Sequence, residues 1–392
     1  MSGPAAGLES AAAAGTGRPD LSQLAIAERW ARSRDFLLRF IRTELGDDSD
    51  LVALAERTLA DGREGLALIG GHTDRTEADP PRLSAGLEVI VETDGSRPAY
   101  LVRDDAIVPD SSPPGYWTDL LRDVIREDAI IAVLRAVGRI DITGDPLGRP
   151  YAGTGWLIGP DLVATNRHVA QIFVDFGAPG GPRVHAARKP RIDFGREFGG
   201  RDSVDPRSLT ELVFCGARPI PPAGVDHAAL DLAVFRIGPS ALPDRRPAQL
   251  AVGRGSALVA PGVQVFVAGY PAAPRDTALG SASETDRVLR LLFGKLWGFK
   301  RLAPGEITAP APGRRTIVHD ATTLGGNSGS LVMGVDTAPA VTGIHYGGNW
   351  GSNRANWAHP LAAVLDEPGL PGLRHATLAD LCRAEGVAMA EG

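Results

Sequence analysis

A serine set among three glycines is the first candidate for chemistry in this chain of 392 residues. Ser328 lies in the run Gly-Gly-Asn-Ser-Gly-Ser at 325–330, just ahead of the apolar stretch 331–333. A serine hydroxyl is a poor nucleophile until a base takes its proton. Glycines permit a tight turn and close approach of a substrate, and consecutive amide N–H groups in such a turn can stabilise an oxyanion. Taken alone, the run predicts either a serine nucleophile or an ordinary glycine-rich loop.

A base and a carboxylate precede this serine in a meaningful order. His168 follows a β-hairpin predicted over 153–165. Asp231 interrupts an apolar strand predicted over 228–237, where an unpaired carboxylate would be costly to bury, and the Nδ1–H of a histidine is its natural partner. The order His, Asp, Ser is one of the known chain orders for a Ser-His-Asp triad. Asp226 is the rival to Asp231, but it lacks the apolar alternation that follows Asp231.

These three segments together resemble the chymotrypsin-like serine peptidases in their bacterial form without disulfides. Thr-Asn-Arg-His-Val at 165–169 is similar to the family's histidine segment, Asp-Leu-Ala-Val at 231–234 to its aspartate segment, and Gly-Asn-Ser-Gly-Ser at 326–330 to its serine segment. The resemblance covers about residues 136–365. It implies an all-β fold of two six-stranded barrels, here with a mainly helical N-terminal extension, and a serine endopeptidase that works through an acyl-enzyme intermediate.

The resemblance also implies roles for individual residues. His168 would be the general base, Asp231 its orienting partner and Ser328 the nucleophile, while the backbone N–H groups of Gly326 and Ser328 would form the oxyanion hole. Animal digestive members place an aspartate before the serine and pair it with a newly cut N-terminal amine. Asn327 cannot make that ion pair, so we expect the oxyanion hole to form without N-terminal cleavage.

A second likeness concerns substrate choice. Thr323 and His345 stand where the staphylococcal glutamyl endopeptidases carry a threonine and a histidine that bind an acidic P1 side chain. Within the strand predicted over 340–348, residues 344–348 resemble theirs. Its Tyr346 and Gly347 would line the same pocket. A hydroxyl and an imidazole can both donate hydrogen bonds to a carboxylate. The alternative is that His345 only fills the pocket wall.

Charge and cysteine content restrict the partners and the compartment. The net charge is −6, which makes no electrostatic case for nucleic acid. No stretch is long and apolar enough for a membrane span, and the N-terminus lacks the basic and apolar regions of a secretory signal. Cys215 and Cys382 are the only cysteines, which favours a cytoplasmic location. No metal-ligand spacing is present, so we expect neither a metal nor another cofactor.

Composition and turn signals predict five regions along the chain. Residues 1–20 are rich in Ala, Gly, Ser and Pro and are expected to be disordered. Region 21–70 is predicted to be helical, and 71–130 to be a linker carrying a β-hairpin and a helix. The protease domain is expected over 131–370, and 371–392 is expected to close the chain with a helix and a tail.

Several elements are predicted between these regions and within the barrels. A hairpin over 87–103 should turn at Asp94-Gly95, and a helix is expected over 117–131. A polar, glycine-rich insertion is predicted from His168 to about Ser208. The apolar segment 286–301 is expected to pack on the second barrel as a strand or a helix.

The N-terminal helices are candidates for regulation rather than catalysis. Helices are predicted over 21–45 and 50–60, with Gly62 as a stop. The first carries an apolar stripe, which must be buried against the protease or against a partner. The layout resembles bacterial cytosolic peptidases fused to small helical modules in defence-like systems. It implies a regulatory protein partner in addition to a protein or peptide substrate.

Two other function classes remain open from the sequence. The same fold could grip peptides as a chaperone-like binding module, or it could be a scaffold whose N-terminal helices carry the main role. A complete set of Ser, His and Asp favours the enzyme.

Overall fold

The structure is a computed structural model, and its described residues form two compact units. One unit comprises Met1–Ser96 with Pro274–Lys295, and the other comprises Arg97–Ala273 with Leu296–Gly392. The described residues are 22–44, 46, 48–72, 83, 86–87, 89–90, 93–95, 97–112, 115–123, 127–200, 205–222, 225–241, 249–272, 296–310, 315–323, 326–335, 340–349 and 355–391. The predicted disorder over 1–20 and most of the apolar segment 286–301 lie outside them.

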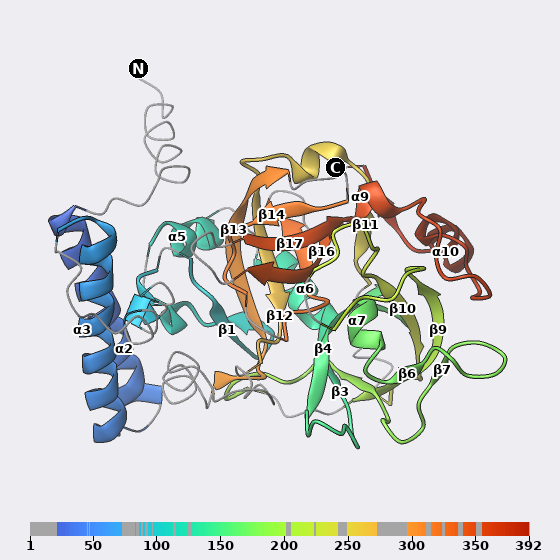
Figure 1. Ribbon diagram of the computed structural model, residues 1–392, viewed down its shortest axis with the longest axis horizontal. Helices are drawn as coiled ribbons and strands as arrows, with labels where there is room; N and C mark the ends of the chain where they lie inside the picture. The colour runs from blue at the N-terminus through green and yellow to red at the C-terminus, as the bar shows by residue number, and fades with distance from the viewer. Residues whose placement is uncertain are drawn as a thin grey trace. The chain divides into compact units, whose positions relative to one another are not determined.

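The first unit is built on two helices that lie side by side, α2 (Gln23–Glu44) and α3 (Ser49–Ile69) (Figure 1). Asp48 caps α3, because its side chain accepts hydrogen bonds from the N–H groups of Asp50 and Leu51. Helix α3 runs through Gly62, so the predicted stop there is wrong. A Cβ at Gly62 would lie 2.3 Å from the Gly86 carbonyl oxygen, so close packing rather than helix termination requires this glycine.

The hairpin predicted over 87–103 is also wrong. The described residues between 83 and 93 are helical, and the Asp94 N–H donates to the Ile90 carbonyl oxygen at 2.8 Å. A short apolar run does not distinguish a strand from a buried helix by periodicity alone. The hairpin in this part of the chain joins β1 (Tyr100–Arg103) to β2 (Ala106–Ile107), and it turns at Asp104 and Asp105, both with positive φ.

The first barrel is a closed ring of six antiparallel strands in the order β10-β5-β4-β3-β8-β9. Its strands are β3 (Val137–Asp141), β4 (Tyr151–Gly159), β5 (Leu162–Thr165), β8 (Arg191–Asp193), β9 (Arg207–Cys215) and β10 (Ala233–Ile237). Strand β8 lies inside the segment predicted as a polar insertion, which also holds the small pair β6 (Val174–Asp175) and β7 (Arg183–Val184). β8 has a single apolar residue, Ile192, which is fully buried. One apolar residue gives no alternation from which a strand could be predicted.

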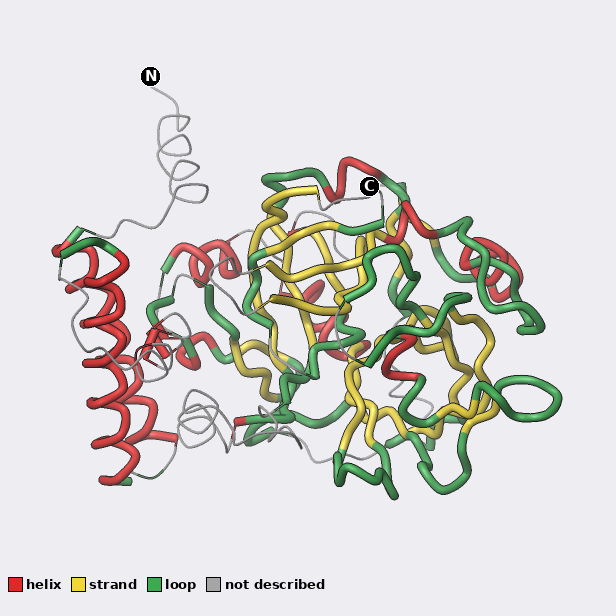
Figure 2. Tube along the Cα trace, viewed as in Figure 1, coloured by secondary structure: helices red, strands yellow, loops and turns green. Residues whose placement is uncertain are grey.

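The second barrel is likewise a ring of six antiparallel strands, in the order β12-β15-β16-β17-β14-β13, closed by pairing of β13 with β12. Its strands are β12 (Gln264–Gly269), β13 (Arg301–Pro310), β14 (Ile317–His319), β15 (Leu331–Gly334), β16 (Ala340–Asn349) and β17 (Ala355–Pro360). β11 (Ala251–Gly253) pairs in parallel with the start of β16, and β18 (Met389–Ala390) pairs in parallel with β11. The expected all-β double barrel with N-terminal helices is therefore confirmed (Figures 1 and 2).

Short helices complete the second unit. They are α5 (Tyr116–Asp123), α6 (Glu127–Ala136), α7 (Arg167–Ala170), α9 (Leu361–Val364) and α10 (Leu378–Glu385), with 3-10 turns at Pro109–Ser111 and Ser256–Val259. α5 and α6 replace the one helix predicted over 117–131. Thr377 caps the N-terminus of α10 through the Asp380 N–H, and Gly386 ends it in the left-handed conformation.

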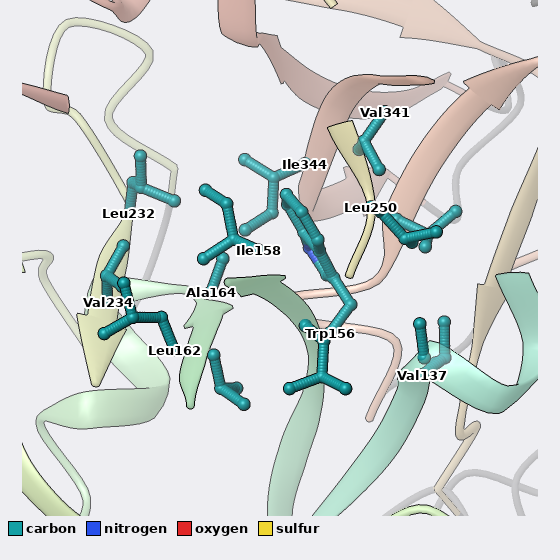
Figure 3. Packing of buried hydrophobic residues seen from close by; sticks show 14 of the residues in the cluster. Val137, Trp156, Ile158, Leu162, Ala164, Leu232, Val234, Leu250, Val341 and Ile344 are labelled. Atoms are coloured by element: carbon teal, nitrogen blue, oxygen red, sulfur yellow. The ribbon is translucent and has the colours of Figure 1, made fainter. Parts of the chain in front are cut away.

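One hydrophobic core runs through both barrels. Trp156 on β4 is fully buried and lies near Val341 and Ile344 on β16 of the other barrel, with Leu250 between the barrels beside it (Figure 3). Because this shared core is densely packed, it fixes the position of one barrel relative to the other. That relation matters here, since the candidate site residues come from both.

The segment before the first barrel is part of the barrel unit. Strand β1 pairs with β13, with Tyr100 opposite Leu302, and both residues are fully buried. Lys300 is also fully buried, and its ammonium donates to the carbonyl oxygens of Leu134 and Phe194, each at 2.8 Å. The compact unit that holds the barrels therefore begins at Arg97, earlier in the chain than the expected start of the protease domain at 131.

A truncation series tests this boundary. A chain starting at Arg97 should fold with cooperative thermal unfolding, whereas a chain starting at Asp110 should unfold at a lower temperature or be insoluble. The second truncation removes β1 and exposes the core that Tyr100 covers, and burial of a large side chain contributes about 1.5–3 kcal/mol. Circular dichroism melts of both proteins measure the difference. Equal melting temperatures would place β1 outside the cooperative unit.

Candidate active site

His168 and Asp231 meet at one end of the first barrel. β5 ends at Thr165, and His168 lies in the short helix α7 after it, while Asp231 stands two residues before β10. The His168 Nδ1 lies 2.6 Å from Asp231 Oδ2, and the His168 backbone N–H donates to Asp231 Oδ1 at 2.9 Å. An ionised carboxylate only accepts, so Nδ1 carries the proton and Nε2 is left with its lone pair. This arrangement orients the imidazole as a base.

The rival carboxylate has other partners. Asp226 accepts a hydrogen bond from the Ala228 N–H at 2.9 Å, and it lies 3.6 Å from the Arg218 guanidinium. Its side chain is about a third exposed, whereas that of Asp231 is 4% exposed. The buried carboxylate beside His168 is therefore that of Asp231.

Two glycines shape the loop that carries Ser328. Gly326 and Gly329 have φ of +89° and +88°. A Cβ at Gly329 would lie 2.2 Å from the Thr154 carbonyl oxygen, and one at Gly326 would lie 2.6 Å from that of Tyr270. Both positions therefore require glycine. The turn closes by a hydrogen bond of 2.8 Å from the Ser330 N–H to the Asn327 carbonyl oxygen.

A threonine on the first barrel binds this loop of the second. The Thr154 N–H donates to the Ser328 carbonyl oxygen at 2.9 Å, and its hydroxyl donates to the Gly326 carbonyl oxygen at 3.0 Å. These two bonds hold the loop backbone on either side of Asn327. Among the residues that the structure describes, the Gly326 and Ser328 N–H groups have no acceptor. In general, N–H groups of neighbouring residues in such a turn can act together on one anionic oxygen.

The predicted pocket residues lie on β16 and on the loop before Ser328. His345 is buried, and its Nδ1 lies 3.3 Å from Nε2 of His319 on β14. Burial lowers the pKa of His319 to about 3 and holds the pKa of His345 well below its usual value. Both imidazoles are therefore neutral at neutral pH. Tyr346 bonds through its hydroxyl to Thr316 and to His227, each at 2.8 Å.

Thr323 is engaged inside the protein. Its hydroxyl donates to Asn356 Oδ1 at 2.5 Å, and the Asn356 amide in turn donates to the Ala321 carbonyl oxygen at 2.8 Å. Thr323 is 3% exposed, and its hydroxyl is used on Asn356. Gly347 leaves room beside Trp357, since a Cβ there would be at an ordinary contact distance of 3.6 Å.

Sequence reasoning missed three residues that touch the candidate site. Thr154, His319 and His359 contact the serine loop, His345 and Asp231 respectively. Each of the three is distant in sequence from the residue that it contacts. No spacing rule could have found them, because strand pairing and barrel packing bring them there.

The remaining chemistry of the described residues is limited. Cys215 and Cys382 are both buried and unpaired, and burial raises the pKa of each thiol to about 11. Within the described ranges, no group of three or more His, Cys, Asp or Glu side chains could hold a metal ion. None of the described helices has the length and apolar character needed to cross a membrane.

Comparison with known proteins identifies relatives of this chain. The family model of the trypsin-like peptidase domain matches residues 153–344, a span that includes all three motif segments and ends within β16. A protein of Lysobacter enzymogenes described as a probable serine protease is 33% identical over 352 residues, covering 84% of this chain and 85% of that protein. The resemblance inferred from the three motifs is confirmed, and the chain belongs to the trypsin-like serine peptidases, with the chymotrypsin-like double barrel of a serine endopeptidase.

Proposed function

We propose that Ser328, His168 and Asp231 form the catalytic triad of this endopeptidase. The observation that carries the assignment is the 2.6 Å contact between His168 Nδ1 and the buried carboxylate of Asp231. It leaves Nε2 of His168 as the only basic nitrogen of the ring. Ser328 is the serine at the centre of the loop that Thr154 binds to the same barrel.

The reaction then proceeds through these groups. His168 Nε2 takes the proton of the Ser328 hydroxyl as Oγ attacks the scissile carbonyl, and the negative charge on the carbonyl oxygen is stabilised by the Gly326 and Ser328 N–H groups. His168 returns the proton to the leaving amine, which gives an acyl-enzyme. Water, deprotonated by His168, attacks the ester and regenerates Ser328. Asp231 stabilises the imidazolium at each step and stays ionised.

Substitution of each member tests the triad. Ser328→Ala and His168→Ala should lower kcat by about 10⁴-fold or more, because triad members act as a unit. Asp231→Asn should fold yet lose most activity, since the amide favours the wrong tautomer of His168. Turnover of a peptide library and labelling by a fluorophosphonate probe measure these effects.

Asp226→Asn is the matched control and should retain activity, because Asp226 pairs with Arg218 and Ala228. Greater sensitivity at Asp226 than at Asp231 would reassign the triad. Peptide binding without labelling of Ser328 would indicate the chaperone-like module in place of the peptidase.

We also propose that the enzyme prefers an acidic P1 side chain. A carboxylate needs a donor, and a neutral His345 can supply one if its Nε2 carries the proton. This tautomer results when His319 Nε2 donates to His345 Nδ1 across the 3.3 Å between them. The support comes from this histidine pair and from the likeness of β16 to glutamyl endopeptidases, while Thr323 acts indirectly through Asn356.

A profile of P1 preference tests this proposal. Cleavage should favour Glu and Asp, and His345→Ala should remove that preference while changing the rate on apolar P1 substrates less. Measurement of kcat/KM on a peptide series that differs only at P1 gives both numbers. Dominant cleavage after basic or large apolar residues would refute an acidic pocket.

A third proposal concerns location and control. We propose a bacterial cytoplasmic protease with a regulatory or defence-associated role, in which the N-terminal helices bind a protein partner. The two unpaired buried cysteines support a reducing compartment. The helices form a separate compact unit. Arg97, the first residue of the barrel unit, pairs with Asp320, and its carbonyl oxygen accepts a hydrogen bond from the Thr322 hydroxyl at 2.7 Å. The start of the barrel unit thus contacts the loop that leads to Ser328.

Removal of residues 1–96 tests the regulatory role. The shortened protein should keep fluorophosphonate labelling and cleavage of short peptides, because every proposed triad member lies in the barrel unit. It should lose processing of host proteins, read as new N-termini in a proteomic comparison with the Ser328→Ala variant. The same set of host cleavages from both lengths of chain would argue against recruitment by the helices.

A further inference from the structure

The backbone of Asp231 has unusual partners. Asp231 precedes β10, so its N–H and carbonyl are outside the strand ladder, yet the residue is 3% exposed. A buried backbone group without a partner is costly. The Asp231 N–H donates to Nε2 of His359 at 3.0 Å, and its carbonyl oxygen accepts from the Asn166 amide at 2.8 Å. Side chains therefore satisfy both backbone groups of this residue.

His359 reaches Asp231 from the second barrel. It lies on β17, opposite Ile344 of β16, and is fully buried. Its Nδ1 is 2.6 Å from the Arg315 carbonyl oxygen. A carbonyl oxygen can only accept, so Nδ1 carries the proton and Nε2 must accept from Asp231. The ring therefore donates through Nδ1 to the Arg315 carbonyl oxygen and accepts through Nε2 from the Asp231 N–H.

The ring of His359 is held in place by its neighbours. It stacks on Tyr346 with centroids 4.2 Å apart and an interplanar angle of 20°, and the Tyr346 hydroxyl is bonded to Thr316 and His227. The titratable or charged groups that face it are Asp231, Arg315, His227 and Tyr346. Burial lowers the pKa of His359, which favours the neutral ring whose Nε2 accepts from Asp231.

We propose that His359 is a positioning residue for the reaction: it anchors the Asp231 backbone to the second barrel, so that the carboxylate meets His168 while His168 faces Ser328. The inference rests on the proposed triad. His168 and Asp231 belong to the first barrel and Ser328 to the second. Thr154 joins the serine loop to the first barrel, and His359 makes the reciprocal connection from the second barrel to Asp231. Together they fix the distance across which the proton must move.

Three substitutions at His359 separate positioning from simple core packing. His359→Phe fills the same space but has no acceptor. His359→Asn can still donate to the Arg315 carbonyl oxygen, but its amide ends short of the Asp231 N–H. His359→Gln extends far enough to present an acceptor to Asp231. His375→Phe is the matched control, because His375 is another buried histidine, bonded to Glu385 rather than to a proposed triad member.

We expect His359→Phe and His359→Asn to lower kcat/KM by about 10²-fold, the effect of a displacement of roughly 1 Å at a catalytic group. The loss should fall on kcat rather than on KM, and the fluorophosphonate rate should fall in parallel. The acidic limb of the kcat/KM profile should move to lower pH, because protonated His168 loses part of the carboxylate's stabilisation. His359→Gln should restore both the rate and the profile, and His375→Phe should change neither.

The inference fails if His359→Asn keeps the wild-type kcat and pH profile, or if all three variants lose activity only in proportion to a lowered melting temperature. The Asn variant decides the question even where the Phe variant does not fold. Failure of the triad itself looks different: wild-type protein would then show no labelling that depends on Ser328, and the positioning role would fall with it. Normal labelling with an unchanged His359→Asn profile removes the positioning role alone.

Discussion

The buried carboxylate of Asp231 is the constraint on which the rest of the site depends. A carboxylate with 4% of its side chain exposed is costly to leave without hydrogen-bond partners. His168 supplies two donors, one from the ring and one from the backbone. The residue's own N–H and carbonyl are satisfied by His359 and Asn166. The same bonds that make Asp231 tolerable inside the protein also orient His168.

Hydrogen bonds within the loop and from the other barrel hold the serine loop. Asn327 is buried, and its carbonyl and side-chain oxygens accept from the N–H and hydroxyl of Ser330. Thr154 supplies the bonds from the other barrel. Because Asn327 is neutral, we expect the loop to need no ion pair with a newly cut amine. The chain just before the barrels is held as a strand, since β1 adds to the sheet beside β13.

The buried Lys300 shows how tightly that preceding chain is integrated. Its ammonium bonds to α6 and to the segment after β8, and it lies 3.3 Å from Glu197 Oε1, while Glu197 Oε2 accepts from the Asp105 N–H in the β1–β2 turn. Burial lowers the pKa of Lys300, and Glu197 opposes that shift. Removing either charge would leave the other buried and unpaired, which is strongly destabilising. One ion pair thus joins four segments that are distant in sequence.

The amino-acid sequence by itself carried the three motif segments, because residue type and spacing within a short segment are local properties. Those segments indicated the family, and the resemblance to that family implied the double barrel. It also pointed to the histidine on β16 as a pocket residue, whose role stays a proposal. It could not place β8, because a strand with one buried isoleucine shows no alternation of apolar and polar residues. It also could not identify the helical segment near Ile90, because the apolar run there fits a strand equally well. Only the tertiary structure decided that Thr154 holds the serine loop, that His319 pairs with His345, and that His359 meets Asp231. These contacts join residues far apart in the chain, and they exist because barrel closure and packing bring their strands together.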